Sequence, residues 1–284
     1  MKSKEVNQKV NRRMSVKQSL NRLFMILVAF IAAMTFTACV ENDENGTGDE
    51  KPGQISGLGS NKGKVEGKAF ELPEGVIFDG DLWGSDWNAL LPNQQIHSAT
   101  VKSAQVSSFY ASITDGVTTR SIFNYRYDCR GSGLNVIIII PLKNNTSRPI
   151  DVEFPAGMLF EAVDKKYQHG VLLKKTKVSV PAGGNTYRFA LFLYCCNEHV
   201  TIPDTSTKYL KPVITNSKLL LHLCDLVKNK RINIEENMDT IEHWSEYVTM
   251  ATNLQELVWK LTDRGQMLDK TDLDYIAGLP NSNQ

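Results

Sequence analysis

An uncharged apolar run, LFMILVAFIAAM at residues 23–34, lies near the amino end of the chain. The stretch before it, residues 2–22, is strongly basic and has Glu5 as its one acid. A basic stem, a short apolar run and small residues at its end are the three parts of a secretory signal. The run is too short to cross a bilayer as a helix, which needs about 20 residues. We therefore predict a signal segment over residues 1–38, with Met1 or Met14 as its start.

Polar and small residues dominate the next segment, residues 39–66. After Cys39 it is rich in Gly, Asn, Asp, Glu, Ser and Lys, and it contains no aromatic residue. Such a composition cannot bury enough apolar surface to offset the entropy lost on ordering. We predict a flexible tether over residues 39–66, with the folded part of the chain beginning at residue 67.

Short β-branched runs and partial alternation between residues 97 and 195 predict β-strands. The run LNVIIIIPL, residues 134–142, follows Gly133 and favours a buried strand over a helix. The segment LKNNTSRPIDVEF, residues 142–154, has the turn chemistry of a hairpin. Six or seven short strands with turns at near-regular spacing predict an antiparallel β-sandwich domain over residues 67–214.

Beyond residue 215 the apolar period becomes helical. In SKLLLHLCDLVKNK, residues 217–230, Ser217 is the candidate N-cap. The pairs Asp239–Glu242 and Thr252–Gln255 have capping-box spacing, which predicts two separate helices, the second of them ending at Gly265. A last short helix, TDLDYIAG at 271–278, precedes Pro280. The prediction is a helical cap over residues 215–284, and hence a fold that is mostly β with some α.

The charge of the chain is nearly balanced, with 32 basic and 31 acidic residues. Basic residues are not clustered in a recognisable nucleic-acid-binding motif, so we expect no nucleic-acid partner. The tryptophans in FDGDLWGSDWNALLP, Trp83 and Trp87, are expected to pack in the core, although exposed positions would favour sugar stacking.

The residues FTAC at 36–39 resemble a bacterial lipobox, with Phe36 where Leu is commonest. The resemblance implies that Cys39 is the first residue of the mature chain and carries acyl chains, which hold a protein firmly to a membrane. The acidic stretch ENDEN at 41–45 resembles the surface-export signal of lipoproteins in Bacteroidetes-type bacteria. An ordinary cleaved signal with an incidental cysteine, followed by a solvated linker, is the alternative.

The run NVIIIIPLKNNTSRPIDVEFPAGMLF, residues 135–160, is similar to the strand–turn–strand signature of secreted immunoglobulin-like modules. The resemblance implies an immunoglobulin-like antiparallel β-sandwich, a fold that implies no particular function.

Of the five cysteines, four lie beyond Cys39, namely Cys129, Cys195, Cys196 and Cys224. An exported protein meets oxidising surroundings, so these four are candidates for disulfides, with three possible full pairings. Cys195 and Cys196 would point to opposite faces of a strand. A bond from either to Cys224 would clip the cap to the sandwich and stabilise it by roughly 3 kcal/mol. Buried free thiols are the alternative.

The residues around these cysteines suggest two kinds of reactive site. Cys196, His199, His222 and Cys224 are of the right types for zinc, but His222 and Cys224 would lie about 200° apart around a helix, so we expect no metal. Cys196 and His199 are the candidate pair for a Cys-dependent hydrolase, yet no oxyanion turn or other catalytic motif accompanies them. We predict no enzymatic activity and no cofactor.

The segments LYCCNEH at 193–199 and NLQELVWKLTDRG at 253–265 resemble the two halves of the thioester domains of Gram-positive surface adhesins. In that family a cysteine after a tyrosine is joined to the glutamine of a Gln-x-x-x-Trp motif. The resemblance implies a bond from Cys196, or its neighbour Cys195, to Gln255, with Trp259 at the matching position. The alternative is that Gln255 completes the Thr252 capping box and Trp259 packs in the core.

These observations together favour a non-catalytic, lipid-anchored envelope protein of the outer membrane, either periplasmic or surface-exposed. Its role would be binding or scaffolding, and its partner another envelope protein or a glycan. A covalent thioester adhesin and a Cys-dependent hydrolase are the alternatives.

Overall fold

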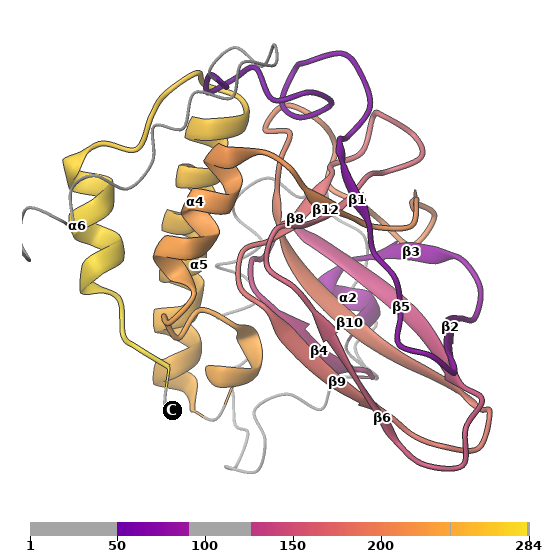
Figure 1. Ribbon diagram of the computed structural model, residues 1–284. Helices are drawn as coiled ribbons and strands as arrows, with labels where there is room; N and C mark the ends of the chain where they lie inside the picture. Colours follow the sequence, from indigo (N-terminus) through magenta and orange to yellow (C-terminus); the bar gives the residue numbers. More distant parts are fainter. Residues whose placement is uncertain (1–49, 91–125, 239, 283–284) are drawn as a thin grey trace, which may run out of the picture. The chain divides into compact units, whose positions relative to one another are not determined.

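A computed structural model of the chain describes residues 50–90, 126–238 and 240–282, all within the unit Asp49–Gln284 (Figure 1). Cys39 and the strands predicted between residues 97 and 125 lie outside the described residues. None of the helices that the structure describes is long and apolar enough to cross a membrane.

The described elements are mostly β-strands, with the helices concentrated near the carboxyl end. The strands are β1 (Gly67–Ala69), β2 (Val76–Phe78), β3 (Leu82–Ser85), β4 (Asp128–Gly131), β5 (Val136–Asn144), β6 (Ile150–Phe154), β7 (Met158–Phe160), β8 (Gly170–Leu172), β9 (Thr176–Val180), β10 (Thr186–Cys195), β11 (Lys208–Tyr209) and β12 (Val213–Thr215). The helices are α2 (Trp87–Leu90), α4 (Lys218–Val227), the 3-10 helix η1 (Ile234–Glu236), α5 (Ile241–Thr262) and α6 (Lys270–Gly278).

Strands β5 and β10 form the centre of a ten-stranded sheet. Their antiparallel ladder runs from the pair Thr186–Lys143 to the pair Leu193–Val136. Every position of β5 is buried except Lys143, which is half-buried. A strand covered on both faces accommodates a continuous run of β-branched residues, so the prediction of a buried strand here is confirmed.

Alternate residues of the central strands face two separate apolar cores. Ile137 and Ile139 belong to the helix-side core, with Leu254 of α5 among its members. Ile138 belongs to the ribbon-side core, together with Phe154 of β6. Helices α4 and α5 therefore contribute to the core on one face of the sheet, and the two-stranded ribbon β6–β9 to the core on the other. Figure 1 shows helices α4, α5 and α6 together on one side of the strands.

The large sheet closes on itself next to β7. The chain continues from β7 to Ala162, which forms an antiparallel bridge with Tyr209 of β11. Strand β11 pairs with β3, which pairs with β5, while β7 also pairs with β8, which pairs with β10. The fold is thus β-rich and mostly antiparallel with some helix, as predicted. An immunoglobulin-like arrangement of the strands is not confirmed.

The turn predicted after β5 joins two strands that do not pair with each other. Strand β5 pairs with β10, β3 and β2, whereas β6 pairs with β9. The side chain of Asn144 donates to the carbonyl oxygens of Arg148 at 2.8 Å and Val180 at 3.1 Å, which ties the turn to the end of β9. The turn therefore carries the chain from the sheet to the ribbon. The hairpin prediction is wrong, because turn residues specify a change of direction and not the partner strand.

The prediction of helices beyond residue 215 is confirmed. The predicted break between two of these helices is wrong. Ser217 caps α4 by accepting from the Leu220 amide at 3.2 Å. Residues predicted as two helices form the single helix α5, capped by Thr240. The Thr252 hydroxyl donates to the carbonyl oxygen of Val248 four residues earlier, at 2.8 Å, and so lies inside a helix instead of capping one. The Thr252 capping box is therefore absent, and Gln255 has another role.

Residues 50–66, which the sequence assigns to the tether, pack against the rest of the fold. Ile55 is 6% exposed and Leu58 is 0% exposed, and both belong to the helix-side core. The amide of Gly59 donates to the carbonyl oxygen of Cys196 at 2.8 Å. The carboxylate of Glu50 accepts from the Leu219 amide at 3.0 Å, at the start of α4. The folded part of the chain therefore includes this segment, which we call the strap.

Candidate functional site

The cysteine pair Cys195–Cys196 lies where β10 ends, beneath helix α5. The side chain of Cys195 belongs to the ribbon-side core, whereas that of Cys196 belongs to the helix-side core with Cys129 and Cys224. The prediction that the pair points to opposite faces is confirmed. All four thiols are buried, and the structure has each of them free.

Gln255 of α5 binds the main chain of Cys195 with both ends of its carboxamide. Its Oε1 accepts from the Cys195 amide at 2.8 Å, and its Nε2 donates to the Cys195 carbonyl oxygen at 2.8 Å. Gln255 is only 4% exposed, so this side chain satisfies two main-chain groups that water does not reach. The structure thus brings together two residues sixty positions apart, and the contact is with Cys195.

Trp259 completes this group from the next turn of α5. Side chains four residues apart lie on one face of a helix, so Gln255 and Trp259 face the same end of the sheet. Trp259 packs against the ribbon-side core, which contains Cys195. The guanidinium of Arg264 lies 5.6 Å from the centre of the Trp259 ring, on the solvent side. We call Cys195, Gln255 and Trp259 the Cys–Gln site.

Burial keeps the thiols of this region protonated at neutral pH. It raises the pKa of Cys195 to about 12, although the nearby Asn197 amide and Trp259 side chain partly oppose the rise. Burial also raises the pKa of Cys196, Cys129 and Cys224. Because the thiolate is the reactive form, none of the four is activated as a nucleophile in this state.

Asn197 holds the end of β10 to two other segments. Its Oδ1 accepts from the His169 amide at 3.2 Å, and its Nδ2 donates to the carbonyl oxygen of Gly59 in the strap at 2.9 Å. Its main-chain amide donates to the sulfur of Cys195 at 3.2 Å. No sequence motif pointed to Asn197, since its partners come from distant parts of the chain.

The histidines do not complete a catalytic pair with these cysteines. His199 is exposed, whereas Cys196 is fully buried in the helix-side core. His169 is buried, its Nδ1 accepts from the Ala162 amide at 3.0 Å, and burial lowers its pKa to about 4. His169 is therefore neutral near pH 7 and is engaged in holding the chain where the sheet closes.

Other predicted site residues serve the core. Trp87 packs against Phe192 and Trp244, with ring centres 5.1 and 5.6 Å apart, and Trp83 also packs against the helix-side core. His222 is exposed on α4 while Cys224 is buried. Within the described residues, no three His, Cys, Asp or Glu side chains lie together in a way that could hold a metal ion.

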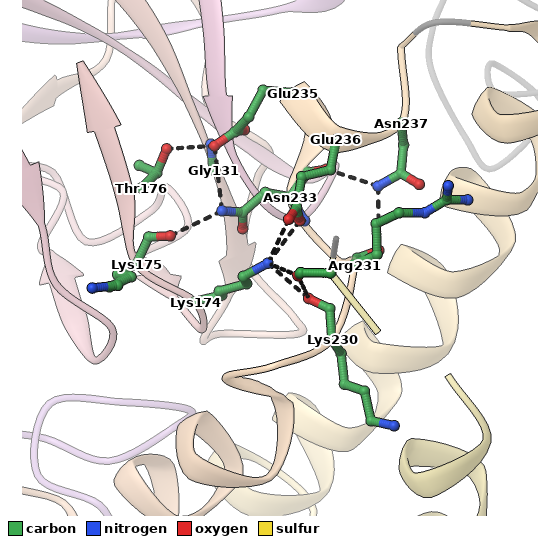
Figure 2. Close-up of polar contacts among 11 residues, drawn as sticks. Gly131, Lys174, Lys175, Thr176, Lys230, Arg231, Asn233, Glu235, Glu236 and Asn237 are labelled. Atoms are coloured by element: carbon green, nitrogen blue, oxygen red, sulfur yellow. Dashed lines mark hydrogen bonds and ion pairs between the residues drawn. The ribbon is translucent and has the colours of Figure 1, made fainter. Parts of the chain in front are cut away.

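A second polar cluster joins the helical region to the sheet, and Figure 2 shows its side chains converging. Lys174, after β8, is 8% exposed. Its Nζ donates to the two carboxylate oxygens of Glu236 at 2.7 and 2.8 Å, to the carbonyl oxygen of Lys230 at 2.8 Å and to the Ser282 hydroxyl at 2.5 Å. The partners of this lysine come from segments up to 108 positions away, so local sequence patterns do not predict the cluster.

Glu235 lies in the same cluster, and no basic side chain of the described residues forms an ion pair with it. Its carboxylate accepts from the Gly131 amide at 2.9 Å, from the Thr176 hydroxyl at 2.5 Å and from the Asn233 side chain at 3.3 Å. Burial raises its pKa and the neighbouring Glu236 adds to the rise, while the hydrogen bond from Thr176 and the charge of Arg130 oppose it. The native fold therefore holds the Glu235 proton more tightly than the unfolded chain does.

The raised pKa of Glu235 predicts a pH-dependent stability. The contribution of this residue is most favourable below the unfolded pKa and is lost as pH rises through the folded pKa. Glu235→Gln removes the ionisation but loses an acceptor for one of the three donors, so its stability to urea relative to the wild type should improve as the pH rises from 4.5 to 7.5. Glu74→Gln, a change at an exposed carboxylate, is the control and should leave the stability difference between the two pH values unchanged. A stability of Glu235→Gln relative to the wild type that is equal at both pH values would contradict the prediction.

Comparison of the chain with protein-family models, with curated proteins and with solved structures finds no match in any of the three. The proposals below therefore rest on the residues themselves.

Proposed function

We propose that the chain is a lipid-anchored protein of the bacterial outer membrane that binds or scaffolds a partner without catalysing a reaction. The observation that carries the proposal is the position of Cys39. It ends a lipobox-like FTAC after a basic stem and an apolar run, eleven residues before the strap begins at Glu50. The head would stand in the periplasm or on the cell surface, and its partner would be another envelope protein or a glycan.

The environment of the candidate catalytic groups supports a non-catalytic role. Burial raises the pKa of Cys196, the candidate nucleophile, and places it in the helix-side core, whereas its candidate partner His199 is exposed. Exposed apolar side chains support a binding role, among them Val163 and Leu210, which are 55% and 47% exposed. Both belong to the segments that pair where the sheet closes.

An immunoglobulin-like β-sandwich arrangement of the β-rich head is part of the same proposal. Its support is the layering of the fold, in which the ribbon β6–β9 packs over the central strands β5 and β10 around an all-apolar core. Two turns, after β5 and after β9, carry the chain between these layers, as in sandwich folds.

Replacing the anchor residue tests the proposed location. The Cys39→Ala variant, expressed in a bacterium that processes lipoproteins and fed an alkyne-tagged fatty acid, should lose its label to background. Cys224→Ala removes a buried thiol of the head and should keep the label. Retention of the label by Cys39→Ala would rule out the anchor.

A covalent adhesin is the second candidate function, and the contact between Gln255 and Cys195 favours it. Formation of the thioester would join the Cys195 sulfur to the side-chain carbonyl carbon of Gln255. The thiol proton would leave with the carboxamide nitrogen as ammonia, and a partner amine would later attack the thioester and take over the acyl group. The carboxamide of Gln255 is held to the main chain of Cys195 by two 2.8 Å hydrogen bonds. The sulfur of Cys195 contacts the main chain of Asn197, so it would have to turn toward Gln255 for the bond to form. The alternative partner Cys196 has its side chain in the helix-side core, to which α5 also contributes.

A further inference from the structure

The carboxamide of Gln255 binds β10 just beyond the point where β5 ends. The ladder between β5 and β10 stops at the pair Val136–Leu193. Two residues further along β10, the amide and carbonyl oxygen of Cys195 are bound by Gln255 instead. Asn135 directly precedes β5, and its Nδ2 donates to the Oε1 atom of Gln255 at 3.4 Å. The end of β5 therefore contributes a side chain to the Cys–Gln site.

Two N–H groups converge on the carbonyl oxygen of Gln255. Its Oε1 accepts from the Cys195 amide and from the Asn135 side chain. Turning the carboxamide over would place its own NH₂ group against these two donors, so the hydrogen bonds fix which atom is the oxygen. Gln255 is only 4% exposed, so water competes little for this oxygen. Two fixed donors on one carbonyl oxygen are the arrangement that stabilises an oxyanion during acyl transfer.

Cys195 supplies one of these donors and also the sulfur nucleophile. In acyl-transfer sites, the main-chain amide of the nucleophilic residue commonly serves as one oxyanion donor. The Cys195 sulfur now accepts from the Asn197 amide at 3.2 Å. Because the sulfur belongs to the residue whose amide binds Oε1, rotation about the Cα–Cβ bond is the movement that turns it toward the carboxamide carbon. The catalytic hydrogen bonds of such a resting site tighten as charge develops.

The sulfur has donors for the charge that it carries when it leaves. One is the Asn197 amide. The other is the indole N–H of Trp259, which is buried and has no acceptor in hydrogen-bond geometry among the described residues. It lies near Cys195 and lowers the pKa of this thiol, against the larger and opposite effect of burial. A thiolate released from the thioester returns to this position, where both N–H groups stabilise it.

We propose that Asn135 and the Cys195 amide form an oxyanion hole for the Oε1 atom of Gln255, which makes Asn135 a catalytic residue of thioester formation. The inference rests on the covalent adhesin, the second candidate function. The Cys195 sulfur attacks the carboxamide carbon of Gln255, and the two N–H groups stabilise the negative charge that develops on Oε1. The bond from this carbon to Nε2 then breaks, and the thiol proton leaves with Nε2 as ammonia. A partner amine that later attacks the same carbon places its charge on the same oxygen.

Loss of ammonia during refolding of the full chain tests the role of Asn135. The chain is purified in urea, diluted into buffer with a phosphine reductant that keeps its thiols free, and followed by intact mass. Asn135→Leu removes the donor at similar size and should lose ammonia about 100-fold more slowly than the wild type. Asn253→Leu is the matched control. Asn253 is exposed on the same helix as Gln255, so this variant should react at the wild-type rate.

The variant Asn135→Asp separates hydrogen-bond donation from packing. At pH 7.5 its ionised carboxylate has no hydrogen to donate, so it should be as slow as Asn135→Leu. Toward pH 4 the carboxyl group becomes protonated and donates again, so its rate should approach that of the wild type at the same pH. A rate that stays low at pH 4 in a folded Asn135→Asp chain would assign Asn135 a packing role and overturn the proposal.

Two further results would contradict different parts of the inference. Equal rates of ammonia loss for the wild type, Asn135→Leu and Asn135→Asp would overturn the oxyanion hole alone. A refolded wild type that keeps the full mass of its sequence would overturn the covalent adhesin and, with it, the oxyanion hole.

Discussion

Replacing Leu58 by alanine should lower the free energy of unfolding by about 3 kcal/mol, as expected for a large aliphatic side chain in a closed core. Leu58 is 0% exposed and packs with the helix-side core, although it lies in a segment with the composition of a linker. The cost combines the lost apolar burial with the cavity left between the strap and the helices. Urea unfolding of the wild type and of Leu58→Ala measures it directly.

The control for Leu58 comes from the same strap. Gln54 is exposed, so Gln54→Ala should change stability by less than about 0.5 kcal/mol. If Leu58→Ala changed the free energy of unfolding as little as Gln54→Ala, the strap would contribute nothing to the stability of the fold and would belong to the tether. The fold would then begin near β1, as the composition alone indicates.

Replacing Gln255 by alanine should also cost about 3 kcal/mol. The change removes both partners of the Cys195 main chain and leaves a buried amide and a buried carbonyl oxygen unsatisfied, each at about 1–3 kcal/mol. Thr249→Ala, at an exposed position of the same helix, should have little effect. A loss for Gln255→Ala below about 0.5 kcal/mol would show that the Gln255 contact does not hold α5 to β10.

The Gln255→Ala variant also separates the two candidate functions. If the chain forms the thioester, the wild type should be lighter than its sequence by one ammonia, and the variant should show no such deficit. If the chain is a non-covalent binding protein, both proteins should have the mass of their sequences while the stability loss persists.

Strand β5 and helix α4 were predictable because their signals are local. The continuous apolar run in β5 is typical of a strand that is buried on both faces. Ser217 caps α4 through its own side chain, so the start of this helix is marked by a single residue. The alternation of Cys195 and Cys196 between two cores follows from strand geometry alone.

The errors arise where a distant partner decides the outcome. Thr252 and Gln255 have the spacing of a helix start, but helix α5 runs through them because Gln255 is engaged by β10. The turn after β5 has hairpin residues, but the end of β9 binds it through Asn144. Tertiary contacts therefore override local preference at these positions.

The composition of residues 50–66 predicted a flexible tether, whereas the structure has this segment packed on the fold. The polar cluster around Lys174 could not be predicted from any local sequence pattern. Ile55 and Leu58 are buried in the helix-side core, and hydrogen bonds of Glu50 and Gly59 add to this burial, so a mostly polar segment belongs to the fold. The ion pair of Lys174 with Glu236 joins segments that are 62 positions apart. Neither segment contains a sequence pattern that predicts the other as its partner.

The most direct test of the account is the intact mass and first residue of the protein extracted from the membranes of a lipoprotein-processing bacterium. We predict a chain that begins at Cys39 and carries the added mass of acyl chains on that residue. A chain that begins elsewhere, or that begins at Cys39 without acyl chains, would contradict the lipid anchor on which the proposed function rests.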